Sequence, residues 1–161
     1  MELYFLILHP LVMLGSGLMA GLFFIFSTCV MKALEGLRPP EGITAMQSIN
    51  RTIKNPLFAL VFWGTPVACL LLMISTLFHW QGLPSIFLLA GGVCYLAGGL
   101  LVTLIIHVPM NNKLATLHRD APNAANFWAN YVSRWTRWNH LRTVMTLIAL
   151  TLFLWYAMSI N

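Results

Sequence analysis

Charged side chains are scarce in this 161-residue chain. Only 8% of the residues are Asp, Glu, Lys or Arg, whereas 59% are hydrophobic, and the mean hydropathy is +0.79. A soluble domain carries about a quarter charged residues, which cover its surface. The composition therefore excludes an ordinary water-soluble domain and predicts an integral membrane protein.

Acidic residues and cysteines are both too few, and too scattered, for several kinds of site. The chain has four acids, and the shortage excludes a carboxylate-rich di-iron centre and argues against a transporter, which would need a buried acid within a span. Three cysteines lie in apolar runs without CxxC spacing, which indicates buried packing residues. The acids are Glu2, Glu35, Glu41 and Asp120, and the cysteines are Cys29, Cys69 and Cys94.

Four apolar runs are each long enough to cross a bilayer, for which about 20 residues suffice. They predict an all-α integral membrane four-helix bundle, a single transmembrane domain over residues 1–161. The start of the chain has no basic segment of the signal-peptide type, so we expect the first run to remain as a span. The spans are expected at about 3–30, 56–78, 86–108 and 141–160.

Small residues indicate where the helices approach one another. Gly17 and Gly21 form a GxxxG step in the first span, and Ala90, Cys94 and Gly98 form one face of the third. We expect both sets to pack within the bundle and the third span to be the most tightly packed helix. A short amphipathic helix over residues 42–55 is expected to lead into the second span.

Basic residues are confined to the two long loops and the head of the last span, which together hold all nine Lys and Arg. By the positive-inside rule, both loops are expected in the cytoplasm and both termini outside, most simply in a bacterial inner membrane. The net charge of +5 is therefore a topology signal and does not indicate nucleic-acid binding. The bilayer is the expected partner, and the composition also allows an oligomer.

Residues 126–142 combine aromatic and cationic side chains just before the last apolar run. Trp128, Tyr131, Trp135 and Trp138 recur at steps of three or four, which places them on one face of a helix. An aromatic stripe beside arginines is typical of a helix at a bilayer interface. We expect an amphipathic aromatic cytoplasmic helix that leads into the last span and covers one mouth of the bundle.

Polar side chains gather at this same membrane end. They precede the second span, close the third and open the fourth, and intramembrane polar groups usually face the bundle interior. The pattern predicts a pocket beneath the aromatic helix, although helix caps and lipid-headgroup contacts would give a similar pattern. The candidate residues are Asn50, Asn55, His107, Asn111, Trp135, Trp138, His140 and Arg142.

Three short motifs resemble the small four-span membrane proteins of the anthrone oxygenase-like family, and the resemblance covers nearly the whole chain. The motifs are Ser48-Ile49-Asn50-x-x-Ile53-x-Asn55-Pro56, Val108-Pro109-Met110-Asn111-x-x-Leu114 and Trp138-x-His140. The resemblance implies a cofactor-independent monooxygenase that oxidises the central methylene of an anthrone, or a related flat quinol, to a quinone with O₂. Family membership alone does not define the substrate.

The residue types suit such chemistry. His140 or His107 is a candidate general base, because a histidine titrates near neutral pH. Arg142 and the amides of Asn50 and Asn111 are candidates to stabilise the developing oxyanion. Trp135 and Trp138 are expected to stack on a flat hydrophobic aromatic substrate, and Asn55 completes the expected binding set.

Two alternatives stay open. Histidines at positions 107, 140 and 118 offer a minor possibility of a bound copper or iron, but no HxxxH or HxxE pair supports it. The other alternative is a bundle without enzymatic activity that binds lipid, quinone or a protein partner, since aromatic and arginine side chains suit anionic headgroups.

Overall fold

A computed structural model describes residues 3–159 of the chain. Within this part the chain is all helix, with no β-strand, as the sequence predicts. The expected end of the fourth span, Ile160, lies outside the described residues, as do Met1, Glu2 and Asn161. The helical segments are α1 (Leu3–Ile25), η1 (Phe26–Val30), α2 (Met31–Glu35), α3 (Pro39–Thr52), α4 (Pro56–Phe78), α5 (Leu83–Cys94), η2 (Tyr95–Leu101), η3 (Thr103–His107), α6 (Val108–Ala115) and α7 (Ala124–Ser159).

Four of the resulting helices are long and apolar enough to cross a membrane, which makes the chain a multi-pass membrane protein. Several segments join end to end, so that α1, η1 and α2 form one rod and α5, η2, η3 and α6 form another. The membrane-length helices are Phe5–Glu35, Pro56–Phe78, Leu83–Ala115 and Ala124–Ser159.

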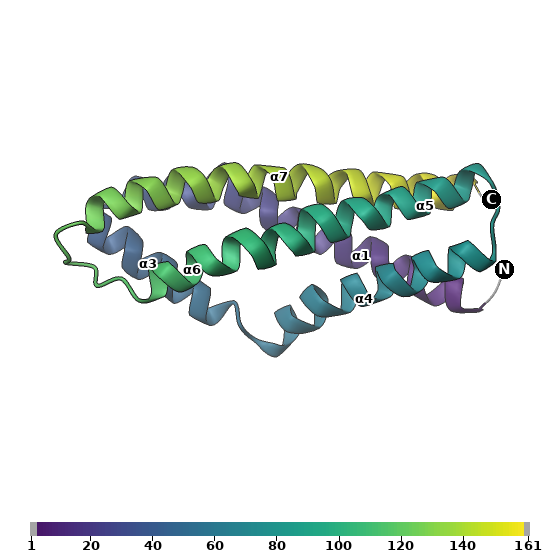
Figure 1. Cartoon of the computed structure of the whole chain (residues 1–161), viewed down its shortest axis with the longest axis horizontal. Coiled ribbons are helices and arrows are strands. Elements are labelled where there is room, and N and C mark those ends of the chain that lie inside the picture. The colour runs from purple at the N-terminus through teal and green to yellow at the C-terminus, as the bar shows by residue number, and fades with distance from the viewer. Residues whose placement is uncertain (1–2, 160–161) are drawn as a thin grey trace.

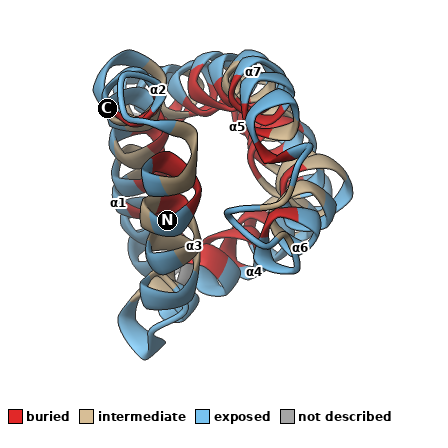
Figure 2. Ribbon diagram, turned by 90° about the vertical axis from the view of Figure 1, so that its left-hand side faces the viewer, coloured by how far each residue is buried: buried red, intermediate tan, exposed pale blue. Residues whose placement is uncertain are grey.

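The four long helices form a ring in which each runs antiparallel to its two neighbours (Figures 1 and 2). Helix α1 packs on α4 and α7, and α5 packs on the same two helices from the other side. Both ends of the chain and the short link between α4 and α5 lie at one end of the bundle (Figure 1). The two basic connections, with α3 and α6, lie at the opposite end.

The helices at the basic end are longer than the sequence predicts. The first rod was expected to end near Val30 but continues to Glu35, because Met31 and Leu34 are buried there. Helix α3 begins at Pro39 rather than Gly42. The aromatic helix, which was expected to lead into the last span, is continuous with it in the single 36-residue helix α7.

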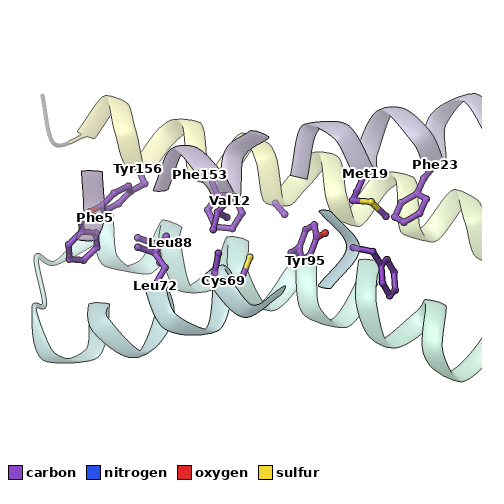
Figure 3. Close-up of a cluster of buried hydrophobic side chains, with 13 residues drawn as sticks. Phe5, Val12, Met19, Phe23, Cys69, Leu72, Leu88, Tyr95, Phe153 and Tyr156 are labelled. Atoms are coloured by element: carbon purple, nitrogen blue, oxygen red, sulfur yellow. The ribbon is translucent and has the colours of Figure 1, made fainter. Parts of the chain in front are cut away.

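The described structure has two apolar clusters, and the second explains why the helices at the basic end are longer than expected. The larger lies between the four rods, where side chains from α1, α4, α5 and α7 point toward one another (Figure 3). The second lies at the basic end, where Trp128 and Tyr131 of α7 pack with Ile43 and Met46 of α3 and with Leu114 of α6. The aromatic stripe is thus the core of a small subassembly that continues beyond the bundle. Cys69 and Cys94 belong to the larger cluster, whereas Cys29, expected to be buried, is exposed.

Small residues mediate close helix contact in the third rod, as expected, but not at the GxxxG step. A Cβ atom added to Gly98 would lie 2.1 Å from Cβ of Met145 on α7. At Gly17 the nearest atom, from Leu150, would be 3.9 Å away, and at Gly21 no atom would lie within 4 Å. Gly17 therefore makes only ordinary contact with α7, and the expectation that Gly21 packs within the bundle is wrong, because Gly21 is exposed.

The two glycines give a matched test of the helix packing. We expect Gly98→Ala to lower the free energy of unfolding by about 1–3 kcal/mol, because the added methyl group must push α7 away. Gly21→Ala should leave stability unchanged or raise it by up to about 1 kcal/mol, through helix propensity alone. Unfolding of the purified variants in mixed micelles, followed by circular dichroism, measures both. Equal effects at the two positions would contradict the packing of the third rod on α7.

Candidate functional site

A cavity of about 500 Å³ opens at the basic end of the bundle. Side chains from α1, η1, α3, α4, η3, α6 and α7 line it. The structure brings together there most of the residues that the sequence singles out, from segments that are far apart along the chain. The predicted residues that line the cavity are Asn50, Asn55, His107, Asn111, Trp135 and Arg142.

His140 and Trp138 do not line this cavity. His140 is exposed and Trp138 is only half-buried. On α7 the buried residues Trp135, Asn139 and Arg142 recur at steps of four and three, which is one helix face. His140 is one residue beyond Asn139 and is therefore rotated by about 100° from that face. The structure thus places one predicted base candidate, His107, at the cavity and the other on the outer surface.

Arg142 is the most unusual residue of the site, because its side chain is only 5% exposed. One terminal nitrogen donates to Oγ1 of Thr103 at 3.0 Å, and the other donates to Oδ1 of Asn139 at 2.5 Å. The guanidinium carbon lies 4.0 Å from the ring centroid of Phe23 and 5.3 Å from that of Trp135. Such cation–π contacts stabilise a desolvated cation by about 2 kcal/mol.

No carboxylate neutralises this guanidinium within residues 3–159. Glu41 pairs with Arg38 and Asp120 pairs with Arg119, both on the exposed surface, and no acid lines the cavity. The Nε atom of Arg142 is buried and has no hydrogen-bond partner. Buried charges are normally paired, because an isolated ion is costly to desolvate. The cavity therefore contains a positive charge with unused hydrogen-bonding capacity.

Asn139 holds Arg142 in place, although the sequence analysis did not select it. Its Nδ2 donates to the carbonyl of Phe23 and to Oγ of Ser27, both at 2.7 Å. Ser27 lies in η1, a π-helical segment in which the N–H of Met31 reaches the carbonyl of Phe26, five residues back. Thr103, the other partner of Arg142, begins the π-helical segment η3. One π-helical segment thus contacts Arg142 directly, and the other contacts Asn139, which holds Arg142; π-helical turns frequently occur at functional sites.

His107 is buried between two backbone carbonyls. Its Nδ1 lies 3.4 Å from the carbonyl oxygen of Val102, and its Nε2 lies 3.3 Å from that of Trp135. The Trp135 ring stands perpendicular to the imidazole at 4.8 Å. A carbonyl only accepts hydrogen bonds, and a neutral imidazole carries one N–H. Only a protonated His107 could donate to both carbonyls at once.

The three asparagines have different local roles. Asn111 accepts hydrogen bonds at Oδ1 from the Tyr131 hydroxyl at 2.8 Å and from Nε1 of Trp135 at 3.1 Å, so it orients the aromatic wall. Asn55 accepts from the backbone N–H of Phe58 at 2.9 Å and caps α4, which is the ordinary structural role. Asn50 carries a buried Nδ2 without a partner.

The histidines do not gather into a metal-binding cluster in the described part of the chain. Within residues 3–159 no group of three or more His, Cys, Asp or Glu side chains is placed to hold an ion. His118 is exposed in the connection before α7, and His107 and His140 do not share the cavity.

The cavity combines apolar walls with unsatisfied donors. Phe23, Phe62 and Trp135 give it flat aromatic surfaces. Among the described residues that line the cavity, the buried N–H groups without partners belong to Arg142 and Asn50. The arrangement suits a flat apolar molecule that carries an oxyanion or a carbonyl oxygen.

Comparison with known proteins places this cavity in a wider context. The model of the family described as anthrone oxygenase matches residues 58–152, more than half of the chain. The match includes His107, Asn111, Trp135 and Arg142. No curated protein and no solved structure matches the chain significantly.

Two substitutions distinguish the effect on stability of the buried Arg142 charge from that of Asn139, which holds it in place. We expect Arg142→Met to leave the unfolding temperature unchanged or to raise it, because an apolar side chain removes an unneutralised buried cation. Asn139→Leu should destabilise by about 2–4 kcal/mol, since the Phe23 carbonyl and the guanidinium both lose a buried partner. Thermal unfolding in detergent distinguishes the two. A large loss of stability in Arg142→Met would show that the guanidinium stabilises the fold.

Proposed function

Because the chain belongs to the anthrone oxygenase family, we propose that it is a membrane-embedded monooxygenase acting on a flat aromatic substrate of the anthrone or quinol type. The reaction uses O₂ and needs no bound metal or organic cofactor. The observation that carries this proposal is Arg142, a buried guanidinium that lines an aromatic cavity and meets no carboxylate in the described residues.

The size and walls of the cavity support such a substrate. A volume of about 500 Å³ lies within the range of small-molecule sites. The rings of Phe23 and Trp135 flank the guanidinium, so a planar molecule bound there would place an oxygen near Arg142 and its rings against aromatic side chains. Asn50 also lines the cavity and carries a second buried donor without a partner.

The chemistry begins with proton loss from carbon. The central methylene of an anthrone is acidic because its anion is a delocalised phenolate. Arg142 stabilises the oxygen that gains this charge, and donors of this kind act strongly where water is excluded. O₂ then adds to the electron-rich carbon to give a peroxide, which takes up a proton. Loss of water leaves a carbonyl, so that one O₂ converts CH₂ to C=O and releases one H₂O.

His107 is the base in this proposal, since it is the histidine that lines the cavity. Once it accepts the substrate proton, both ring N–H groups have a backbone carbonyl nearby, from Val102 and Trp135. Proton transfer requires the imidazole to turn one nitrogen toward the substrate.

The same contacts favour a second candidate function, which is binding without turnover. Both nitrogens of His107 face carbonyl oxygens rather than open space in this conformation. A protein that only sequesters a quinone or phenolate would need Arg142 and the aromatic walls but no mobile base.

Anthrone turnover by single variants tests the proposal. We expect purified protein in liposomes to convert 1,8-dihydroxyanthrone to the anthraquinone faster than the spontaneous rate, with stoichiometric O₂ consumption. Arg142→Gln should lower kcat by about 10²–10³-fold through loss of oxyanion stabilisation, and His107→Ala by about 10²–10⁴-fold through loss of the base.

His140→Ala is the matched control, because it removes an exposed imidazole on the same helix end. Its activity should equal that of the unmodified protein. An active His107→Ala variant would refute the base assignment, and anthrone binding without any turnover would favour the second candidate function.

We also propose that the protein resides in a bacterial inner membrane with its basic end in the cytoplasm and both termini outside. The positive-inside rule supports this orientation, because Lys and Arg lie at the end that carries α3 and α6. The cavity would then open at the cytoplasmic leaflet.

Single-cysteine labelling in intact spheroplasts measures the orientation. In a variant without the native cysteines, Gln81→Cys should react with a membrane-impermeant maleimide added outside. Lys113→Cys should react only after the membrane is permeabilised, because this exposed residue lies at the opposite end of the bundle. The reverse labelling pattern would overturn the proposed orientation.

A further inference from the structure

One side of the cavity is not closed by helix packing. Helix α4 packs on α1, α5 and η2, but it makes at most marginal contact with η3 or α6 within the described residues. Figure 1 shows the first turns of α4 diverging from α6 after the bend that follows α3. The cavity lies behind this divergence, because both helices contribute lining residues.

The residues at the edges of this opening are exposed. Ala59 and Trp63 of α4 line the cavity and are exposed, as are Val108 and Asn112 of α6. All four lie on membrane-length helices. The edge formed by residues 56–63 of α4 extends over roughly 10 Å at 1.5 Å per residue, which matches the long dimension of a flat ring system.

The opening also has a charge of one sign. Arg51 and Lys54, at the end of α3 and in the bend before α4, line the same cavity and are exposed. Inside, Arg142 adds a buried cation. No Asp or Glu is among the lining residues that the structure describes. Positive charges therefore follow one another from the rim to the interior, with no acid to neutralise them.

We propose that the opening between α4 and α6 is a lateral portal through which a flat, anionic amphiphile passes from the bilayer into the cavity. The class of ligand is an aromatic ring system that carries a separate ionised oxygen, such as a phenolate or a carboxylate substituent. Arg51 and Lys54 attract the anion at headgroup depth, and Arg142 binds it inside. This inference deepens the proposed function, on which its site rests, by specifying the route and the charge of the substrate.

A lateral route follows from the physical chemistry of both partners. A planar hydrophobic molecule concentrates in the bilayer, where its rings avoid water and its charged oxygen stays near the headgroups. A path through the membrane-facing side lets the rings slide between Trp63 and Val108 without crossing water. Basic residues near the surface of an anionic membrane enrich such anions locally, and this enrichment weakens at high salt.

The binding kinetics of a fluorescent probe test the portal independently of catalysis. Anthracene-9-carboxylate is flat and anionic, and it accepts excitation energy from tryptophan, so stopped-flow mixing with proteoliposomes reports its arrival. Ala59→Phe narrows the portal at an exposed position, whereas Leu60→Phe, at the adjacent position with 69% exposure, adds the same ring to a face that does not line the cavity.

We expect Ala59→Phe to slow both association and dissociation at least five-fold while the Kd changes less than two-fold, and Leu60→Phe to change neither rate. Unchanged rates in Ala59→Phe would overturn the portal. A weaker Kd at an unchanged association rate would overturn it too, because the ring would then be filling the binding site.

Charge selection needs a neutral probe and a lysine outside the cavity lining as controls. The double variant Arg51→Gln/Lys54→Gln should slow association of the carboxylate about five-fold or more at low salt, and should leave its methyl ester unaffected. Lys113→Gln removes an exposed charge from α6 that does not line the cavity, and should change neither probe. Equal slowing of carboxylate and ester, or equal effects of Lys113→Gln, would refute selection at the rim.

The two proposals fail in different ways. Portal kinetics as described, without turnover of anthrones, would sustain the lateral route and the anionic ligand class and would reject the oxygenase activity. Anthrone turnover without any binding of the carboxylate, or with unchanged probe binding rates in Ala59→Phe, would sustain the activity and reject the portal.

Discussion

The burial of the Arg142 guanidinium without a carboxylate partner is the constraint around which the site is built. A cation in a mostly apolar bundle needs hydrogen-bond acceptors and aromatic faces if no anion is available. Thr103, Asn139, Phe23 and Trp135 supply them, from three different rods. Asn139 in turn requires a free carbonyl and a hydroxyl on the first rod. Phe23, near the end of α1, and Ser27, in the π-helical segment η1, supply these two groups.

Hydropathy alone was sufficient for the fold class and the number of spans, because a bilayer demands about 20 apolar residues per crossing whatever the tertiary structure. It could not predict where the rods end. Met31 and Leu34 stay helical, and α7 passes from the aromatic segment into the membrane without a break, because a second core with α3 and α6 buries one side of them. That core depends on contacts between segments more than 60 residues apart, such as Gln47 donating to the carbonyl of Leu114 at 2.8 Å.

The candidate site, like the fold, could be predicted from the sequence only in part. Polar residues concentrated at one membrane end predicted a pocket, and six of the eight chosen residues line one. The two misplaced residues, Trp138 and His140, lie beside Asn139 in the sequence, and only packing against the first rod determines that Asn139 faces inward. One available signal was overlooked, because Asn139, Arg142, Thr143 and Thr146 form a polar face at helical spacing within an apolar run.

The second core also bears on how the cavity can be reached. By packing on α2, α6 and α7, helix α3 ties the basic end together, yet it leaves the start of α4 attached mainly to α1 and the middle of the bundle. If the ring of four helices were fully closed, no anion could reach Arg142. The free-energy cost of desolvating the guanidinium would then not be offset by ligand binding. An opening on the membrane side resolves this, because it keeps water away from the guanidinium while admitting a ligand whose rings are already in lipid. The unneutralised charge of Arg142 and the incomplete contact between α4 and α6 therefore serve the same function, which is to bind an anionic ligand from the bilayer.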